Sequence, residues 1–441
     1  MLSALSTSLH TALPTLRSAD SIALVVHPRE KSMSTYHCRR TLSIACLRPV
    51  SGPVRMLALG AVCLLLAGGR AGAQGTCPVT EVAVGLQLPL GVIQSSLGNL
   101  LVTETGTGTS DSRISIVSLN GARRTLLAGL PSGINDVREP SGLSAIAMRG
   151  RTLYVAIGVG DVGVPGSIPG TAVPNPAGPS SPIFSSILAI HFSAHVERTT
   201  TGFTLSLTDQ KTLASGEDVT ISYGGGQTIT IELVANFPDY IVDPFLPPGA
   251  VRLSNPFDMV VVGNQLYVTD GGRNLVWQVD IGSGGFSALA SFAPIPNPLP
   301  FGPPVIDAVP TGIAYSKGQL FVTLFRGFPF VPGASVVEQV DPDTGAHAPL
   351  ITGADLKALI DVLPRKEGSD TSYLVLQHAS GAPATLTPPG RLLHVETPGQ
   401  PPQVITDCLG FPTSMALDEK TGTLYVTELR TGRVVAIPVG K

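Results

Sequence analysis

Three acidic residues follow almost the same short phrase at widely separated places in the chain. Glu428 ends Leu-Tyr-Val-Thr-Glu, Asp270 ends Leu-Tyr-Val-Thr-Asp, and Glu104 ends Leu-Leu-Val-Thr-Glu. Carboxylates contributed by several elements are typical oxygen ligands of Ca²⁺. If the three phrases are equivalent strands around one axis, their carboxylates converge at its mouth and form a candidate Ca²⁺ site. The alternative is that these acids bind loop amides and keep the mouth hydrated.

Other polar residues hold positions related to the same mouth. Asp258 and Asp361 share a second position, which we expect one turn before the innermost strands, and they are further candidate ligands. Asn255 also precedes such a strand, and Gln377 occupies the position of the acids in another repeat. Loops on a rigid scaffold often bind ligands, which adds three candidates for ligand contact: Arg138, Arg326 and His378.

The sequence predicts no catalytic residue. It has no Gly-x-Ser-x-Gly motif, and its histidines stand beside no recognisable nucleophile. If the three carboxylates converge, they repel one another at neutral pH unless a cation lies between them. Replacement of Glu428 by Gln is therefore expected to raise the stability of the metal-free form slightly.

The strands that carry these residues belong to a repeated unit. Six segments, which start near residues 88, 140, 255, 309, 360 and 411, each combine a short apolar strand, a polar turn and a second strand like Leu-Tyr-Val-Thr. A second hairpin follows, so the unit has four strands over about fifty residues. This pattern predicts an all-β fold, a six-bladed β-propeller with four-stranded antiparallel blades.

The spacing of the repeats also predicts how the ring is modified and closed. The long gap over 159–254 indicates an enlarged second blade, with an insert at about 193–228 that shows strand-like alternation. A seventh, degenerate blade is the alternative. The last repeat ends after three strands, and "TEVAVGL" (80–86) can supply the fourth. Pairing of the two ends in one blade would leave no open edge in the ring.

The first part of the chain differs from the rest in charge. Residues 1–73 carry eight Lys or Arg and two Asp or Glu, which leaves 20 basic and 29 acidic residues in the remainder. An acidic body argues against nucleic acid as a partner. The stretch 56–73 has the apolar run and the small residues before Gln74 that are typical of a secretory signal peptide. We expect residues 1–55 to be an unstructured leader or an upstream extension, and 74–441 to be the exported propeller, without a transmembrane segment.

Two cysteines remain in the predicted mature chain, Cys77 and Cys408. A pair in an exported protein favours a disulfide. The predicted topology, however, places Cys408 at the end of an outer strand and Cys77 before the start of another, near opposite faces. A strand of six residues spans about 20 Å, whereas bridged Cα atoms lie within about 7 Å. The sequence leaves both possibilities open.

Several stretches resemble the ScyD/ScyE-type proteins, exported six-bladed propellers related to NHL repeats. The similarity covers about 80–441, and its more specific parts are "LVANFPDY" (233–240) and "FRGFPFVPGAS" (325–335). The insert at 193–228 departs from that pattern. The resemblance implies a propeller but no established reaction, so no catalytic residue is transferred from it.

Two classes of function follow from this reading. The first is a binding or interaction module for a small molecule or an extracytoplasmic protein, which we expect to be a monomer. The second is a lactonase-like, Ca²⁺-dependent hydrolase of lactones or esters. The segment "LPLGV" (88–92) lacks the Glu that such enzymes carry there, and Asn255 is the only Asn in an equivalent position. The departure favours the binding module.

Overall fold

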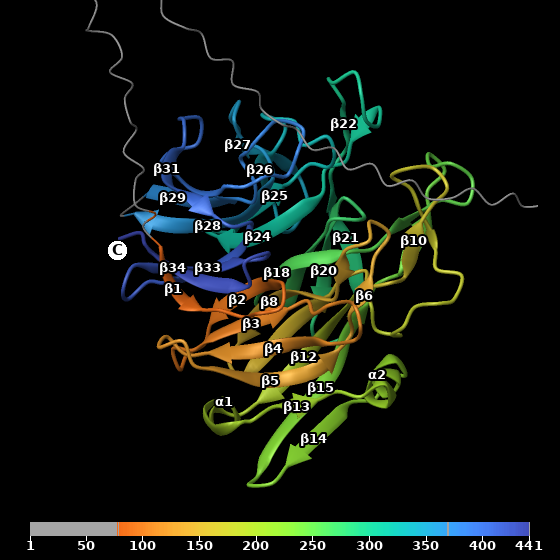
Figure 1. Cartoon of the computed structure of the whole chain (residues 1–441), viewed down its shortest axis with the longest axis vertical. Coiled ribbons are helices and arrows are strands. Elements are labelled where there is room, and N and C mark those ends of the chain that lie inside the picture. The colour runs from red at the N-terminus through yellow and green to blue at the C-terminus, as the bar shows by residue number, and fades with distance from the viewer. Residues whose placement is uncertain (1–76, 78, 368–369, 441) are drawn as a thin grey trace, which may run out of the picture. The chain divides into compact units, whose positions relative to one another are not determined.

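The structure is a computed structural model that describes residues 77, 79–367 and 370–440 (Figure 1). The predicted leader over 1–55 and the predicted signal peptide over 56–73 lie outside these residues. The described part is nearly all β, and its larger sheets are built on the four-stranded antiparallel unit of a β-propeller, with β13 and β14 added as fifth strands to two of them. The predicted fold class is therefore confirmed. Within the described residues, no helix is long and apolar enough to cross a membrane.

Six sheets repeat one plan, in which successive strands follow one another outward from the centre. The first three sheets hold β2 (Pro89–Gln94), β3 (Leu100–Glu104), β4 (Ser112–Val117) and β5 (Arg123–Leu130); β8 (Leu143–Arg149), β9 (Thr152–Ile157), β12 (Ser186–Phe192) and β15 (Gln227–Asn236); and β18 (Pro256–Val262), β19 (Gln265–Asp270), β20 (Leu275–Asp280) and β21 (Phe286–Ser291).

The remaining three sheets follow the same plan. They hold β24 (Pro310–Ser316), β25 (Gln319–Leu324), β26 (Val336–Val340) and β27 (His347–Ile351); β28 (Leu359–Glu367), β29 (Asp370–Gln377), β30 (Gly390–Val395) and β31 (Gln403–Leu409); and β32 (Pro412–Asp418), β33 (Thr423–Glu428), β34 (Arg433–Pro438) and β1 (Thr80–Ala83). The innermost strands touch in a closed cycle, β2 to β8, β18, β24, β28, β32 and back to β2.

The recurring phrase is explained by packing between neighbouring sheets. In β19, Leu266 and Val268 pack against the second sheet, and Tyr267 packs against the fourth. This alternation buries both faces of the strand, as expected for side chains that point to opposite sides in turn. The Thr269 hydroxyl donates to the carbonyl of Thr311 in the next sheet at 2.5 Å. The phrase therefore joins each blade to both of its neighbours.

The ring closes with strands from both ends of the described chain. β1 pairs antiparallel with β34, with Thr80 opposite Ala436. The prediction that "TEVAVGL" completes the last blade is therefore confirmed. Pairing removes the unpaired backbone edge that β34 would otherwise expose.

Cys77 and Cys408 form a disulfide, with their Cα atoms 5.9 Å apart. The expected placement of Cys77 and Cys408 near opposite faces was wrong. Instead, Val79 packs against a core that contains Leu409 of β31 and Met415 of β32. The chain before β1 thus crosses to the fifth sheet and brings Cys77 to the end of β31.

The insert in the second blade contains helices that the sequence pattern did not predict. α1 (Ala194–Thr199) and α2 (Leu207–Ala214) alternate with β13 (Phe203–Thr204) and β14 (Val219–Tyr223). Ser206 and Asp209 form a capping box at the start of α2, a local signal that outweighs the apparent strand alternation. β13 pairs with β5 of the first sheet, so the insert is attached to two blades.

A second excursion from the second blade builds a small separate sheet. Its strands are β10 (Gly163–Pro165), β11 (Ala172–Pro174), β17 (Val251–Leu253) and β16 (Tyr240–Val242), in that spatial order. Figure 1 shows β10 to one side of the ring, near β6. Two short hairpins complete the described strands: β6 (Gly133–Ile134) with β7 (Pro140–Ser141), and β22 (Ile295–Pro296) with β23 (Val305–Ile306).

Candidate functional site

The three acids that follow the repeated phrase anchor the loops that enter their own sheets. Each carboxylate is fully buried and accepts a backbone N–H from the segment before the innermost strand. The bonds are Gln87 N to Glu104 at 2.6 Å, Asn255 N to Asp270 at 2.7 Å, and Gly410 N to Glu428 at 2.8 Å. These contacts match the alternative role, in which the acids bind loop amides.

Each of these carboxylates also has a partner inside its own blade. Glu104 lies 3.2 Å from Nε of Arg113, and Glu428 accepts from Arg433. Asp270 accepts from the indole N–H of Trp277 at 3.0 Å, and burial raises the pKa of this carboxyl. The negative charges of Glu104 and Glu428 are therefore compensated locally.

The structure does not bring the three acids together at the axis. Among the described residues, no group of three or more His, Cys, Asp or Glu is placed to hold a metal. The reason is the period of two along a strand. Asp270 lies on the same face of β19 as Leu266 and Val268, which packs against the preceding blade. The sequence predicted the correct strand ends for the three acids but the wrong face of those strands.

The residues that do face the axis lie in a bulge near the start of each innermost strand. A register shift occurs there in all six strands. A cavity of about 10 Å³ at the centre is enclosed by four of these strands, which is room for about one water molecule. This cavity is too small for an organic substrate. Equivalent bulge positions hold Gly91, Ala145, Asp258, Gly312, Asp361 and Ser414.

Asp258 and Asp361 occupy these bulges, within β18 and β28 rather than one turn before them. Each carboxylate joins two blades: Asp258 accepts from Met259 N at 2.8 Å and Ile313 N at 3.0 Å. Asp361 accepts from the N–H groups of Val362 at 2.7 Å and Met415 at 2.9 Å. Burial raises the pKa of Asp258 to about 6. Burial, followed by the charge of Asp258, also raises the pKa of Asp361 well above its usual range.

Of Arg326, His378 and Arg138, the first two have local partners. Arg326 is buried and donates to the carbonyls of Ala334 and Ala293 at 3.2 and 3.3 Å. His378 is buried, its Nδ1 lies 2.9 Å from the carbonyl oxygen of Pro412, and burial lowers its pKa to about 4. Arg138 is exposed in the turn between β6 and β7. These positions give no sign of a common ligand site.

Asn255 lines a pocket, which we call the mouth pocket. Its volume is about 290 Å³. The Asn255 side-chain oxygen accepts from Val159 N at 3.2 Å, which fixes the amide at the edge of the pocket. The pocket is lined by Asn135, Asp136, Val137, Val159, Gly170, Thr171, Ala172, Leu246, Val251, Arg252, Leu253, Asn255, Gly271, Gly272, Asp307 and Val309.

The small separate sheet forms one wall of the mouth pocket. Ala172 comes from β11, Val251 and Leu253 come from β17, and Leu246 comes from the loop between β16 and β17. The opposite side is formed by loops at the ends of the second and third sheets. The excursion from the regular repeat therefore creates a concave surface that the repeated blades alone do not provide.

The charges of the mouth pocket are unevenly matched. Arg252 donates to Asp243 at 3.0 Å and to Asp307 at 3.4 Å. Partial burial raises the pKa of Asp136, which has no arginine or lysine partner among the described residues. The pocket thus offers more carboxylate than cationic groups. Sequence reasoning missed Asp136, Arg252 and Asp307 because they lie in loops outside the repeat, where no periodic pattern identifies them.

Comparisons with known proteins agree with the fold but identify no function. No protein-family profile and no curated protein matches the sequence. Among solved structures, the calcium structure of Trichoderma reesei Carbohydrate-Active Enzymes Family AA12 is similar at a TM-score of 0.46 and 13% identity, over 83% of this chain and 98% of that one. The PQQ-bound aldose sugar dehydrogenase of Streptomyces coelicolor gives 0.45 and 16%, over 81% and 96%.

A third solved structure, the virginiamycin B lyase of Staphylococcus aureus, gives a TM-score of 0.40 at 11% identity, over 81% of this chain and 98% of that one. These similarities are too distant to carry an argument about activity. Since no family profile matches the sequence, membership of the ScyD/ScyE family stays a prediction.

Proposed function

We propose that this chain is a binding module whose small-molecule site is the mouth pocket. The observation that carries the proposal is the separate sheet of β10, β11, β16 and β17, which is not part of a blade and supplies a wall of that pocket. Ligand sites are commonly concave, with a few polar groups among apolar ones. A pocket of about 290 Å³ suits a small ligand.

The chemistry of the lining indicates what such a ligand carries. Asp136 and Asp307 present carboxylate oxygens, whereas the guanidinium of Arg252 is engaged by Asp243 and Asp307. A ligand with hydroxyl, amide or ammonium donors matches these acceptors. Leu246, Val251 and Leu253 offer apolar contact on the other side. We therefore propose a small polyol or amine as the ligand class.

The Ca²⁺-dependent lactonase is the second reading, and the geometry gives it less support. Its expected ligands Glu104, Asp270 and Glu428 are each bonded within their own blade. Asp258 lines the central cavity of about 10 Å³, which is too small for a lactone. A panel of lactones and esters, assayed with and without millimolar Ca²⁺, tests this reading directly.

Pocket filling tests the binding proposal. Leu246→Trp would place a large side chain in the mouth pocket, while Phe245→Trp changes the adjacent residue, which is 95% exposed and outside the lining. Small polyols and amines are screened by saturation-transfer NMR. A hit that binds the Phe245→Trp variant normally and the Leu246→Trp variant at least about tenfold more weakly supports the proposal. Equal binding to both variants contradicts it.

We also propose that the chain is exported. The Cys77–Cys408 disulfide supports this, because disulfides persist mainly in oxidising compartments. The predicted cleavage after Ala73 is checked by N-terminal sequencing of protein from the producing cell. An uncleaved leader in a cytosolic fraction would contradict export.

A further inference from the structure

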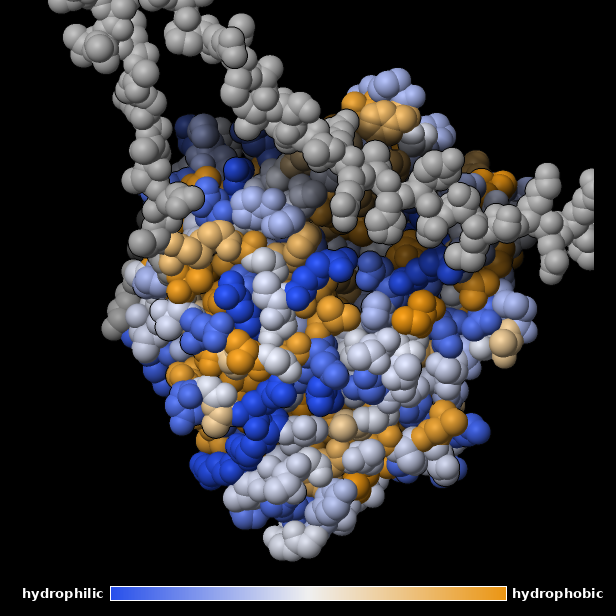
Figure 2. All heavy atoms as spheres, in the orientation of Figure 1, coloured by the Kyte–Doolittle hydropathy of each residue, from blue (hydrophilic) through white to orange (hydrophobic). Residues whose placement is uncertain are grey.

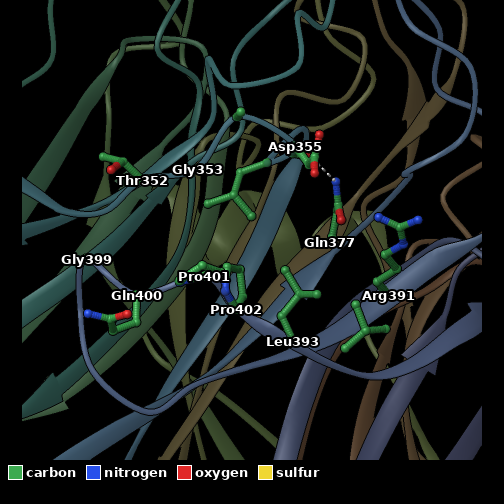
Figure 3. A pocket seen from close by; sticks show the side chains of 13 residues that line it. Thr352, Gly353, Asp355, Gln377, Arg391, Leu393, Gly399, Gln400, Pro401 and Pro402 are labelled. Carbon is green, nitrogen blue, oxygen red and sulfur yellow. Dashed lines mark hydrogen bonds between the residues drawn. The ribbon is translucent and has the colours of Figure 1, made fainter.

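A second pocket lies beside the fifth sheet, separate from the mouth pocket (Figure 3). We call it the side pocket, and its volume is about 440 Å³. It is formed by the loop that leads from β27 to β28, by β30 and β31, and by the turn between those two strands. Its lining consists of Thr352, Gly353, Ala354, Asp355, Leu356, Gln377, Arg391, Leu393, Gly399, Gln400, Pro401, Pro402 and Val404.

Arg391 is an unusual group in this lining. Its Nε atom is buried and has no hydrogen-bond partner among the described residues. Two other arginines have a buried nitrogen without a well-aligned hydrogen bond, but each has a carboxylate nearby. Arg113 lies 3.2 Å from Glu104, and Arg151 lies 2.8 Å from Glu197. Arg391 has no such carboxylate in the part of the chain that the structure describes. A buried donor without an acceptor is costly, so an acceptor supplied by a ligand would be favourable here.

A second cation lies close to Arg391. Lys357 is buried, and its ammonium donates to the carbonyls of Gly381, Ala382 and Thr385 at 3.1, 2.9 and 2.9 Å. Burial, and to a smaller extent the charge of Arg391, lowers the pKa of Lys357. The carbonyl oxygens stabilise the ammonium but carry no formal charge. Lys357 follows Leu356 of the lining, so its positive charge adds to that of Arg391 near the side pocket, and Asp355 is the carboxylate of the lining.

The rest of the side pocket is apolar with a few amide groups. Figure 3 shows Arg391 and Gln377 at one end, Leu393 and the two prolines in the middle, and Gln400 at the far end. The Gln377 amide donates to the carbonyl of Asp355 at 3.4 Å, which leaves its own oxygen and second N–H for other partners. Apolar contact is available from Leu356, Leu393, Pro401, Pro402 and Val404.

We propose that the side pocket binds a small organic carboxylate with an apolar body. The planar guanidinium of Arg391 matches a carboxylate, with which arginine commonly forms two parallel hydrogen bonds. The apolar lining accommodates the body of the ligand. A doubly charged inorganic anion fits less well, because Asp355 would repel it and the apolar surface would remain unused. No predicted site residue other than Gln377 lies in this pocket, and the proposal is independent of the mouth pocket.

The test uses benzoate, hexanoate and inorganic phosphate as probes of the disulfide-bonded mature chain. Thermal unfolding is followed at matched ionic strength, and affinity is measured by calorimetry. A ligand that binds only the folded state raises the unfolding temperature in a concentration-dependent way. We expect benzoate or hexanoate to raise it more than phosphate does. Equal effects of all three salts would show a general ion effect and overturn the proposal.

Four variants locate the binding. Arg391→Gln should lower the affinity for benzoate or hexanoate at least tenfold, whereas Arg149→Gln, which removes the same charge from an exposed side chain, should not. If Arg391→Gln does not fold, Val404→Trp provides the second route. Val404 is 47% exposed on β31 and lines the side pocket, so the larger side chain narrows it while remaining suited to a strand. Unchanged affinity in Val404→Trp, or binding abolished by Leu246→Trp instead, would overturn the proposal.

Discussion

Carboxylates have different partners in two regions of the ring: the seam, where the ring closes, and the centre. At the seam, Glu428 is fully buried but pairs with Arg433, which also lies 3.8 Å from Glu81. The Cys77–Cys408 disulfide adds a covalent link next to these charges. At the centre, the half-buried Asp258 and the buried Asp361 accept backbone N–H groups, and no cation pairs with them among the described residues.

The difference predicts which change affects the stability of each region. A buried carboxylate with a guanidinium partner stays charged and holds its loop. A buried carboxyl without such a partner tends to hold its proton instead. The seam should therefore respond to loss of its partners, and the centre should respond to pH.

Removal of the disulfide should have the largest effect. A bridge between residues 331 positions apart restricts the unfolded chain strongly, and disulfides commonly contribute about 2–4 kcal/mol. We expect the Cys77→Ser, Cys408→Ser double variant to lose about that much free energy of unfolding, measured with urea under oxidising conditions. A chain shortened through Leu86 lacks both the bridge and β1 and should lose more or aggregate. Equal melting of the shortened and full mature chains would mean that β1 does not stabilise the seam.

Glu428→Gln should have the next largest effect and should destabilise the protein. The carboxylate accepts from Gly410, Thr431 and Arg433, and hydrogen bonds to charged groups contribute about 1.5–3 kcal/mol. We expect a loss of about 2 kcal/mol by urea unfolding. This reverses the slight gain expected from sequence. Glu81→Gln is the matched control, since Glu81 is 54% exposed and should cost under about 1 kcal/mol. Similar losses for both variants would remove the distinction between the buried pair and the exposed pair.

A decrease in pH should stabilise the centre. The folded pKa of Asp258 is about 6, above the usual value of 3.8, so between these two pH values the folded state binds a proton that the unfolded state does not. His378, whose folded pKa is lowered to about 4, acts in the opposite direction. Because His378 is present in both proteins, its contribution cancels when the wild type is compared with Asp258→Asn. Between pH 7 and 5 the wild type should gain about 1–2 kcal/mol relative to the variant, and parallel curves would contradict the raised pKa.

Calcium should have the smallest effect. Because Glu104 and Glu428 already have guanidinium partners, we expect millimolar Ca²⁺ and EDTA to give unfolding temperatures that agree within about 1 °C. A clear rise with Ca²⁺ that is lost in Glu428→Gln would restore the metal site at the mouth and weaken the contrast between seam and centre.

The sequence predicted the elements better than the directions of their side chains. The repeated phrase identified the second strand of each blade, and the incomplete last repeat identified β1 as its missing strand. The acids were assigned to the correct strand ends, but the alternation of the strand turns Asp270 toward the preceding blade rather than the axis. Asp258 was expected before its strand because the bulge that it occupies in β18 leaves no mark on the local pattern.

Residues outside the repeat could not be predicted from periodicity. The short helix α2 was signalled only by Ser206 and Asp209, a capping pair that looks like ordinary loop chemistry within an alternating stretch. Arg391 and Asp136 become notable only when segments distant in sequence come together. Among the described residues, Arg391 Nε has no acceptor and Asp136 has no cationic partner, and both facts follow from three-dimensional packing that no spacing along the chain expresses.

The pairing of β1 with β34 also constrains the order in which the protein can mature. β1 is synthesised before every blade, whereas its partner is synthesised after all the others. Until Arg433–Pro438 has been made, the four residues of β1 have no strand to join, and the last blade is incomplete. We therefore expect an interrupted chain to present open edges at both ends, which makes it a target for chaperones and proteases rather than a smaller working propeller.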